Sequence, residues 1–462
     1  MALRIDSRLT AAGLRKPVER MFELSAPRIL SIDKAWPPGT GAPVCTRSGR
    51  YAARGWTEWT QGFQHGSALL QFEATGDRHF LELGRRRTIQ EMGAHLTHVG
   101  VHDHGFNNVS TYGALRRQML EGRIPFCEPE LRFLELALKV SGAVQAARWT
   151  TLPGSTGYIY SFNGPHSLFI DTLRSLRSLA LAHHLGHVLL GERDRRINLL
   201  ERLVRHAEAT IEFNIYFGQG RDAYDVRGRV AHESLFNLND GSYRCPSTQQ
   251  GYSPFSTWTR GLAWAILGCS EQLEFLASIR EREHELVTPA LLGRMEEAAR
   301  ATADRYLEEC CADGIPIWDT GAPGTRRMGD YRSRISDPFN PWEPMDSSAA
   351  AIAAQGFLRL GSHVGGKAGA RYRQAGLTLA RTLLSPPYLS DTGRHQGLLL
   401  HSVYHRPNGW DAIRPGQKVP NGESSMWGDY HLRELGLMLL REARAERPLR
   451  FFEPASPIPP VP

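Results

Sequence analysis

The stretch Asn163-Gly-Pro-His-Ser-Leu-Phe-Ile-Asp171-Thr-Leu-Arg-Ser-Leu-Arg-Ser-Leu-Ala-Leu-Ala-His-His-Leu-Gly186 is rich in large apolar residues. Its first three residues are typical of a helix start, because proline suits a first turn whose amides have no helical partners. Gly186 suits a helix end. The sequence therefore predicts a helix over 165–185. Since a helix that is apolar on most sides is buried, we expect it in the interior of the fold.

Asp171 lies in the early part of this predicted helix. A carboxylate on a buried helix must be paired, hydrogen-bonded or protonated, because burial removes its hydration. A carboxyl group with a raised pKa is what a general acid needs near neutral pH. The alternative is a structural role, in which Arg174 or the N-terminus of a neighbouring helix holds the carboxylate. This stretch alone leaves both interpretations open.

The chain has 462 residues, of which 41% are hydrophobic. Because this length exceeds that of a usual single domain, we expect either two domains or one large closed architecture. No apolar run is long enough to cross a bilayer, and the N-terminus lacks the apolar segment of a signal peptide. These features indicate a cytoplasmic protein with no membrane partner.

The formal net charge of +7 is carried mainly by arginine, since lysine occurs only at positions 16, 34, 139, 367 and 418. No basic tract occurs, so nucleic acid is not an expected partner, whereas a mild positive field favours an anionic substrate. The six cysteines form no Cys-x-x-Cys pair and are expected to be reduced and mostly in the core. The histidines at 183, 184 and 187 are expected to be surface or packing residues, so no metal or other cofactor is predicted.

From Trp59 onward the hydrophobic pattern is helical almost throughout. An N-terminal helix over 8–24, interrupted by Pro17, precedes a loop through Pro43. We predict an all-α protein of helical hairpins, with an N-terminal extension at 1–58, a catalytic barrel at 59–447 and a proline-rich tail at 448–462. The helices after the extension are expected at 59–74, 78–95, 105–121, 128–146, 165–185, 191–209, 256–278, 289–311, 346–361, 366–384 and 425–445.

Every second predicted helix opens with a polar or aromatic cluster, whereas the helices between are ordinary amphipaths. If the hairpins close into a ring, alternate helices run in the same direction and their N-termini lie at one end. The pattern therefore predicts a single-domain (α/α)6 barrel, a six-hairpin toroid, with its site at one mouth. Helical solenoids also alternate, but their repeats resemble one another and these do not. The clusters are Trp59–Phe63, His102–Phe106, Asp171, Ser256–Gly261, Asp346–Ser348 and Trp427–Tyr430.

Two of these clusters contain the candidate catalytic carboxylates. Asp103 alone would be an N-cap, the common role of aspartate at a helix start. With Asp171 at the same end of another inner helix, the two carboxylates could face each other across the cavity. Such a pair raises one pKa by mutual repulsion, and glycosidases use carboxylate pairs of this kind. We expect desolvation and Asp103 to raise the pKa of Asp171, and helix-start amides to keep Asp103 charged.

The residues around this pair are those of a sugar site. Arg260 could hold a carboxylate through its forked donors, or form an ordinary salt bridge between helices. The segment 209–254 is too long for a simple connection, so we expect a functional loop over the mouth. In or beside it lie His232, which could be a reader of polar groups or a structural histidine, and Thr248, Gln249 and Gln250. Tryptophans offer flat faces to pyranose rings, although each could instead pack in the core: Trp59, Trp149, Trp258, Trp264 and Trp427.

The order of these clusters resembles glycoside hydrolase family 88, the unsaturated glucuronyl hydrolases, with family 105, the unsaturated rhamnogalacturonyl hydrolases, as relatives. The chain departs from the family pattern at Gln249, where relatives often have His, in a longer loop at 216–229, and over 418–425. The collinear motifs are Trp59-Thr-Gln-Gly-Phe63, His102-Asp-His-Gly-Phe106, Ile170-Asp171, Gln250-Gly-Tyr252, Ser256-Thr-Trp-Thr-Arg-Gly-Leu-Ala-Trp264, Gly314-Ile-Pro-Ile-Trp-Asp319, Asp346-Ser-Ser-Ala-Ala-Ala-Ile-Ala-Ala354 and Met426-Trp-Gly-Asp-Tyr430.

The resemblance implies a metal-free (α/α)6 barrel that removes a 4,5-unsaturated uronic acid from the non-reducing end of lyase-generated oligosaccharides. In this family the C4=C5 vinyl ether is hydrated, and the aglycone is expelled when the resulting hemiketal opens. By resemblance, Asp171 protonates C4 and assists water at C5, while Asp103 binds ring hydroxyls and modulates the charge of Asp171. The matches to uronate-holding positions are Trp59, Trp149, His232, Thr248, Gln250, Arg260 and Trp264, with extra residues at 150–163 separating Trp149 from Asp171.

Three other functions are considered beside this one. A family 105-type hydrolase would release unsaturated galacturonate from rhamnose. A sugar epimerase on the same toroid would rely on paired histidines, and a non-catalytic toroid would only bind carbohydrate. The presence of both Asp103 and Asp171 argues against the last two.

Overall fold

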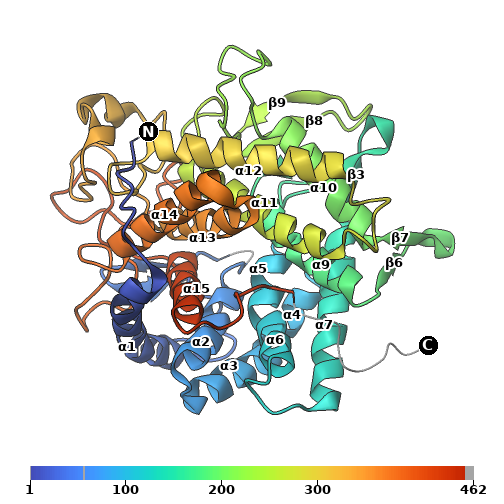
Figure 1. Cartoon of the computed structure of the whole chain (residues 1–462), viewed down its shortest axis with the longest axis horizontal. Helices are drawn as coiled ribbons and strands as arrows, with labels where there is room; N and C mark the ends of the chain where they lie inside the picture. The colour runs from blue at the N-terminus through green and yellow to red at the C-terminus, as the bar shows by residue number, and fades with distance from the viewer. Residues whose placement is uncertain (1, 56–57, 453–462) are drawn as a thin grey trace.

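In the computed structural model, which describes residues 2–55 and 58–452, two layers of helices form a ring (Figure 1). In the described part of the chain, the inner layer consists of six helical segments, each in contact with the next, and the last returns to the first. These are α2 (Gln61–Thr75), α5 (His104–Asn108), α8 (Thr172–Ser175), α11 (Thr259–Ile279), α13 (Ser347–Val364) and α15 (Met426–Ala443).

The short inner segments continue into further helical turns. A π-helical turn at Val109–Gly113 joins α5 to α6 (Ala114–Leu120), and α9 (Arg177–His184) follows α8 directly. The outer layer packs on these helices, and a short α4 (Gly93–Leu96) lies beside α7. The outer helices are α1 (Ala11–Ala35), α3 (Arg78–Glu91), α7 (Glu128–Ala147), α10 (Leu199–Phe213), α12 (Pro289–Glu309) and α14 (Gly366–Leu383).

The burial of the helices explains the two layers. Inner helices such as α11 and α13 are buried on almost every face, whereas the outer α12 and α14 bury one side only. A helix that is apolar all round must be enclosed, and an amphipathic helix can face solvent. The predicted all-α class and closed toroid are confirmed.

The prediction of a continuous helix over 165–185 is wrong. Residues Ser167–Phe169 form strand β5, which pairs antiparallel with β8 (Glu233–Phe236), and Asp171 immediately precedes α8. Gly164, with φ 114°, belongs to a turn rather than a helix start. The apolar run suits a buried strand as well as a helix, and its pairing partner, 64 to 68 residues away in the sequence, is visible only in the folded chain.

The segment 209–254 is more ordered than the expected loop. Helix α10 extends to Phe213, and β8 pairs with β9 (Tyr243–Ser247) to complete a three-stranded sheet with β5. The remaining strands form two-stranded hairpins: β1 (Cys45–Arg47) with β2 (Arg50–Ala52), β3 (Trp149–Thr151) with β4 (Gly157–Ile159), and β6 (Val188–Leu190) with β7 (Arg196–Asn198). The last of these occupies the start of the helix expected over 191–209, which begins only at Leu199.

Helix α1 is longer than the expected helix over 8–24 and passes through both Pro17 and Pro27. It packs against α15 and α2, as Figure 1 shows for the blue and red ends of the chain, and so serves as the outer partner of α15. Its buried side includes Val18, Met21 and Phe22. This long buried stripe outweighs the cost of two helix-interior prolines.

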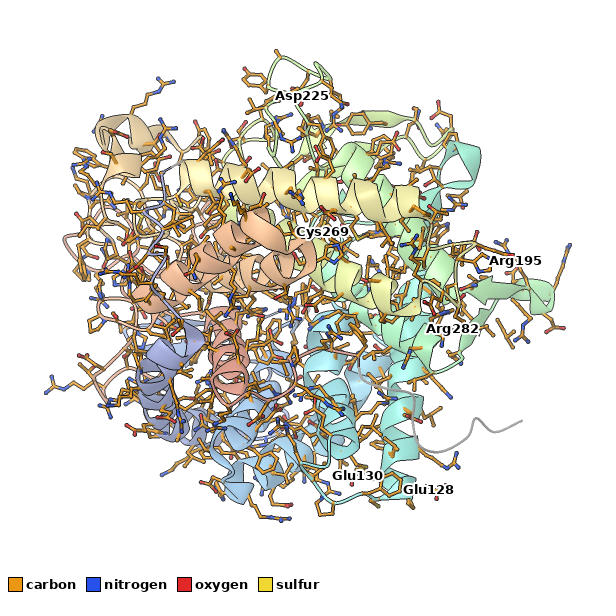
Figure 2. All side chains as sticks on the ribbon, in the orientation of Figure 1. Glu128, Glu130, Arg195, Asp225, Cys269 and Arg282 are labelled. Atoms are coloured by element: carbon orange, nitrogen blue, oxygen red, sulfur yellow. The ribbon has the colours of Figure 1, made fainter. Side chains whose placement is uncertain are left out.

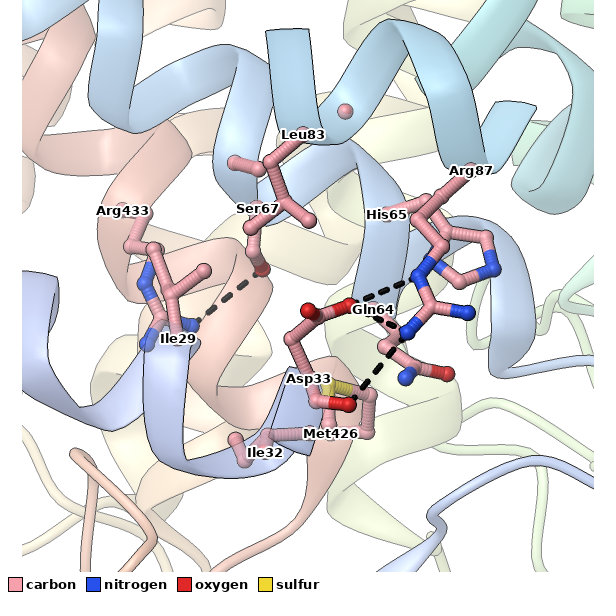
Figure 3. Close-up of a pocket in the computed structure, with 12 residues that line it drawn as sticks. Ile29, Ile32, Asp33, Gln64, His65, Ser67, Leu83, Arg87, Met426 and Arg433 are labelled. Carbon is pink, nitrogen blue, oxygen red and sulfur yellow. Dashed lines mark hydrogen bonds and ion pairs between the residues drawn. The ribbon is translucent and has the colours of Figure 1, made fainter. Parts of the chain in front are cut away.

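Polar contacts complete this junction. Figure 3 shows a small cavity between α1, α2, α3 and α15, in which the Arg87 guanidinium donates to the Asp33 carboxylate at 2.6 Å. Arg433 donates to the Ser67 hydroxyl at 3.2 Å in the same region. These contacts tie the first helices of the chain to the last one.

Of the predicted tail at 448–462, residues 453–462 lie outside the described residues, whereas Leu449, Phe451 and Phe452 are buried against the barrel. Within the described ranges, no helix is long and apolar enough to span a membrane. No cysteine in residues 2–55 and 58–452 forms a disulfide, and Cys45, Cys269, Cys310 and Cys311 are buried as expected. Cys127 and Cys245 are exposed, so they are not core residues.

Candidate active site

The inner helices begin around an open pocket. Its wall combines two carboxylates, an arginine, amide groups and several aromatic rings. The lining residues are Trp59, His102, Asp103, Phe106, Phe162, Asp171, Gln249, Gln250, Trp258, Arg260, Trp264, Tyr404, His405, Asn408 and Trp410.

The predicted convergence of the helix starts at one mouth is found in the structure. Asp103 and Asp171 directly precede α5 and α8, and Arg260 lies in the first turn of α11. Asp346, the N-cap of α13, lies 3.5 Å from Arg260. Trp427, in the first turn of α15, stacks on Trp59 with ring centroids 5.1 Å apart. The direction of alternate helices in the ring thus explains why these distant residues meet.

Asp171 is held in place by the three-stranded sheet. The Ile170 amide donates to the His232 carbonyl at 3.0 Å, extending the pairing of β5 with β8 up to the pocket. The Asp171 carboxylate then faces His102, whose Nε2 lies 3.0 Å from Oδ1. Arg174 forms ion pairs with Glu271 and Glu434 instead. The proposed structural pairing of Asp171 with Arg174 is therefore not present.

His102 reverses the expected electrostatics of the pair. Burial alone would raise the pKa of Asp171, but the hydrogen bond and charge of His102 outweigh burial and lower it. Burial alone would lower the pKa of His102, but the carboxylates of Asp103 and Asp171 outweigh burial and raise it. The expectation that the pKa of Asp171 is raised is wrong, because the sequence did not reveal that His102 would donate to it.

Asp103 also differs from the expectation. Its side chain makes no capping hydrogen bond to α5, so the N-cap interpretation does not hold. Burial, together with the charge of Asp171, raises the pKa of Asp103 despite the opposing charge of His102. The carboxyl group lines the pocket and accepts no hydrogen bond from a residue in the described ranges. Asp103 is thus the group of the pair that burial favours as a neutral acid.

His232 occupies a buried position behind the pocket wall. Its Nδ1 accepts from the amides of Gln249 at 3.1 Å and Gln250 at 3.4 Å, so the ring proton lies on Nε2. Burial lowers the pKa of His232 to about 4, so the ring is neutral near neutral pH. Among the described residues, Nε2 has no hydrogen-bond partner although it is buried. A buried donor without an acceptor is costly, which makes this atom a candidate contact for a ligand.

Arg260 and Gln250 form a polar wall. Arg260 Nη2 donates to Gln250 Oε1 at 2.6 Å and to the Tyr404 carbonyl at 2.8 Å, while Nη1 donates to the Val403 carbonyl. The guanidinium is already bound to protein acceptors, so its role differs from that of an open carboxylate clamp. Because the Gln250 oxygen faces Arg260, the amide NH2 group of Gln250 is left to donate toward the pocket.

Aromatic rings form another part of the pocket wall. Trp59 is half-buried at the pocket surface, with Trp427 stacked behind it. Trp264 and Phe106 pack against each other at 5.1 Å. The Arg260 guanidinium lies between the rings of Trp258 and Trp427, at 4.6 Å and 4.7 Å from their centroids. The wall thus presents flat apolar faces while holding a buried cation behind them.

Trp149 and Thr248 lie outside the pocket lining. The Trp149 ring packs over Gly157 of the β3–β4 hairpin and under the Arg202 guanidinium, which is 3.9 Å from its centroid. Phe162, which follows this hairpin, lies in the pocket instead, parallel to the His102 ring at 6.1 Å. Thr248 accepts the Gly251 amide at 2.9 Å and holds a turn.

Several residues that line the pocket are not among the site residues that the sequence predicts. His102 belongs to the cluster His102–Phe106, and its position next to Asp103 at a helix start is the feature of the sequence that points to it. Phe162 follows the extra residues after Trp149. The irregular segment between α14 and α15 supplies Tyr404, His405, Asn408 and Trp410. Only the folding of that segment over the mouth brings these residues to the site.

The described residues contain no group of three or more His, Cys, Asp or Glu side chains arranged to hold a metal ion. The pocket does offer a proton-carrying carboxylate and imidazole cluster, an amide donor, a buried cation and flat apolar walls. That combination suits an anionic sugar and acid–base chemistry.

The fold and its mouth define an (α/α)6 barrel whose pocket combines aromatic rings with two carboxyl groups. No protein-family model matches the chain. It is 26% identical over 410 residues to the unsaturated glucuronyl hydrolase of Bacillus sp. (strain GL1), covering 86% of this chain and 90% of that protein. It is 21% identical over 387 residues to the unsaturated chondroitin disaccharide hydrolase of Streptococcus agalactiae serotype III, covering 82% and 80%.

A solved structure of an unsaturated glucuronyl hydrolase variant with dGlcA-Glc-Rha-Glc superposes with a TM-score of 0.68. It is 24% identical and covers 94% of this chain and 97% of that one, so the likeness concerns the fold. Together, the sequence and structure comparisons identify this chain as a distant, full-length homologue of the unsaturated glucuronyl hydrolases, glycoside hydrolase family 88.

Proposed function

We propose that this protein is a glycoside hydrolase that releases a 4,5-unsaturated uronic acid from the non-reducing end of lyase-generated oligosaccharides. The observation that carries the proposal is the group formed by Asp103, His102 and Asp171, in which Nε2 of His102 is 3.9 Å from one carboxylate and 3.0 Å from the other. It lies in a pocket walled by tryptophans, as a sugar site requires. The distant homology supports the same reaction class.

The uronate carboxylate binds at the polar wall. The Gln250 amide group donates to it directly, and the buried Nε2–H of His232 supplies a second donor. Arg260 fixes the Gln250 side chain through a 2.6 Å hydrogen bond and adds positive charge from behind. Trp59 and Trp264 cover the faces of the ring. This arrangement explains how the pocket selects an acidic sugar although few charged side chains contact the sugar directly.

The acid step uses the proton shared by Asp171 and His102. The pKa of His102 is raised, and its Nε2 lies 3.0 Å from Oδ1 of Asp171, so a proton on the imidazole can pass to the carboxylate as the substrate binds. Asp171 delivers this proton to C4, and the electron pair of the C4=C5 bond forms the new C–H bond. Positive charge then develops at C5 and on the ring oxygen.

Water completes the reaction. The ionised Asp171 accepts a proton from a water molecule as its oxygen bonds to C5, which restores the starting charge of the pair. The hemiketal at C5 opens by breaking the bond from C5 to the ring oxygen, which leaves a ketone at C5. The hemiacetal at C1 then expels the aglycone as an alcohol and leaves an aldehyde. One water is consumed for each bond cleaved.

Asp103 orients the ring in this scheme. Its carboxyl group lines the pocket beside Asp171 and His102, where it forms a hydrogen bond with a ring hydroxyl. Burial raises the pKa of Asp103, whereas His102 lowers that of Asp171, so the two carboxyl groups differ in their affinity for a proton.

The function is tested with a panel of unsaturated disaccharides, by following the loss of the vinyl-ether absorbance. Turnover of a glucuronate-type substrate supports the proposal, and its methyl ester is expected to react poorly because the anionic group is lost. Turnover only of unsaturated galacturonyl-rhamnose would assign the family 105-type activity instead. If no unsaturated substrate reacts, the proposed function is wrong.

The catalytic assignment is tested with Asp171→Asn, which removes the acid. We expect kcat to fall by about 10²- to 10⁴-fold while substrate affinity changes little, as for a group acting in the transition state. Glu285→Gln, a change at an exposed carboxylate outside the pocket, serves as the control and leaves kcat unchanged. If Asp171→Asn retains more than about a tenth of kcat, its loss of rate is smaller than removal of a general acid usually causes. Should Asp103→Asn retain less than this, Asp103 is the acid.

A further inference from the structure

Gln250 reaches the pocket from an irregular segment between β9 and α11, the wall segment (residues 248–256). The first part of this segment is fixed from behind by the two amides that donate to His232. The Gly251 amide also donates to the Thr248 hydroxyl at 2.9 Å. Because the direction of the Gln250 side chain depends on this backbone, whatever fixes the segment controls the donor that faces the uronate.

Asp319 holds the second part of the wall segment. The Tyr252 amide donates to Asp319 Oδ2 at 2.8 Å, and the Gly321 amide donates to Oδ1 at 2.8 Å. The carboxylate is fully buried and lies outside the pocket lining. An ionised carboxylate accepts through both oxygens, whereas a side-chain amide of the same shape accepts through one. The ionised form of Asp319 is therefore the form that satisfies both amides.

The backbone of Asp319 is joined to the start of α11. It forms an antiparallel bridge with Trp258, which directly precedes the helix. Helix α11 belongs to the inner layer, and Figure 2 marks it by its buried Cys269 near the centre of the view. Asp319 thus ties the wall segment to the helix that carries Arg260.

Gln250 is consequently held at two points relative to one helix. Arg260 binds its side-chain oxygen at 2.6 Å, and Asp319 fixes the backbone two residues further on. Gly251, between these points, packs directly on the carboxylate. A Cβ atom there would lie 2.6 Å from Thr248 Oγ1 and 3.0 Å from Asp319 Oδ2. Such close packing passes a change at Asp319 on to Gln250.

The contact between Asp319 and the wall segment depends on charge. Burial and the charge of Glu343 raise the pKa of Asp319 to about 6, although hydrogen bonds from neighbouring amides and the Ser256 hydroxyl oppose them. The carboxyl group is therefore ionised near neutral pH. As the pH falls through about 6, one oxygen takes up a proton and no longer accepts its amide. A buried charge costs folding free energy, and groups of this kind are enriched at functional sites.

We propose that Asp319 is a positioning residue for uronate binding, which holds the wall segment so that the Gln250 amide group faces the pocket. The inference rests on the proposed function and adds a residue to that same site. Because Asp319 lies outside the pocket lining, it acts through Gln250. Its loss should weaken substrate binding and leave the chemical step at Asp171 nearly unchanged.

The test compares Asp319→Asn with the wild type on an unsaturated disaccharide. At about pH 7.5 we expect KM to rise by about 5- to 20-fold and kcat to change by less than about 2-fold. The ratio of the two KM values should shrink as the pH falls through about 6, because the wild-type carboxyl group then becomes neutral as well. Taking the ratio cancels the titration of His102 and Asp103, which both proteins share.

Asp337→Asn is the matched control. It changes an exposed carboxylate that accepts the Phe339 amide at 2.9 Å, outside the pocket lining, and should leave KM unchanged. Gly251→Ala disturbs the Asp319 contact from the other side, because its added methyl group displaces the wall segment. It should also raise KM, and it decides the test if thermal unfolding shows that Asp319→Asn is not folded.

The outcomes separate this inference from the proposed function. Turnover with an unchanged KM, a fall in kcat as large as the rise in KM, or a KM ratio that stays constant across about pH 6 overturns the positioning role and leaves the proposed function standing. If the disaccharide does not react, the proposed function fails, and calorimetry with the same disaccharide decides the positioning role. Weaker binding by the variant supports it, whereas equal binding, or a wild type that does not bind, overturns it.

Discussion

At the scale of single residues, His102 links the two carboxylates of the pocket. Its Nε2 lies 3.0 Å from Asp171 and 3.9 Å from Asp103, and it is buried. The imidazole thereby couples two groups whose environments shift their pKa values in opposite directions, downward for Asp171 and upward for Asp103. Two titratable groups separated in this way can take different roles in acid–base catalysis.

Because the pKa of His102 is raised, the shared proton is present below that pKa and is lost as the pH rises through it. Wild-type kcat/KM should therefore fall on the basic side. His102→Gln removes the cation, and the proton must then reside on Asp171 alone, whose ordinary pKa is lower. We expect the basic limb of the pH profile to move to lower pH. An unchanged limb, measured on correctly folded protein, would contradict the shared-proton model.

Phe162 and Trp149 offer a second contrast between residues. Phe162 lies in the pocket beside His102, whereas Trp149 packs under Arg202. Phe162→Ala should raise KM by about 2- to 10-fold through the loss of an aromatic contact. Trp149→Ala should leave KM nearly unchanged and lower the free energy of unfolding by about 1–3 kcal/mol. The reverse pattern would restore the substrate-binding role that the family resemblance implies for Trp149.

At the scale of elements, a buried ion network joins the first inner helix to the last. Glu73 of α2 accepts from Arg117 of α6 at 2.6 Å and from Arg441 of α15 at 2.7 Å. All three groups are buried. Burial opposes the charge of Glu73, but the two arginines outweigh it and lower its pKa to about 2. The network therefore fastens the point where the ring closes.

Glu73→Gln leaves buried arginines without their shared carboxylate, so the free energy of unfolding should fall by about 3–5 kcal/mol near neutral pH. A depressed carboxyl pKa stabilises the fold above the unfolded value of 4.5 and loses that effect as the pH falls toward 2. The difference in the free energy of unfolding between wild type and variant, measured by urea titration, should therefore shrink as the pH falls over that range. Glu128→Gln, which breaks an exposed pair with Arg132, should cost less than about 1 kcal/mol. Equal costs for both variants would contradict this role of the network.

At the scale of the whole molecule, α1 closes the ring from outside. Met21 is fully buried against α15, close to Gly436, whereas Leu30 on the same helix is 40% exposed. Met21→Ala should lower the free energy of unfolding by about 2–5 kcal/mol, as a core truncation does. Leu30→Ala should change it by less than about 0.5 kcal/mol. Similar effects of the two changes would show that α1 is not part of the closed ring.

The ring also explains how distant parts of the sequence reach one mouth. Trp59, Asp103, Asp171 and Arg260 line the pocket, and Asp346 and Trp427 stand directly behind it. Alternate helices run in the same direction, so their first turns meet at one end. The site is consequently assembled from every inner helix, and the proposed acid–base chemistry depends on the closure of the whole ring.

The amino-acid sequence by itself determined the helical layers, because the apolar spacing of each helix is a local property of the chain. It also determined which helix starts carry polar clusters, and with them the positions of Asp103, Asp171 and Arg260. Only the tertiary structure decided that Asp171 follows a strand, since β5 needs its distant partner β8 to form. The tertiary structure also decided that His102 approaches Asp171, that Trp149 packs against Arg202, and that Phe162 lies in the pocket. Hydrogen bonds and burial depend on residues that lie far apart in the sequence, so the pKa values of the site are set only after the ring has closed.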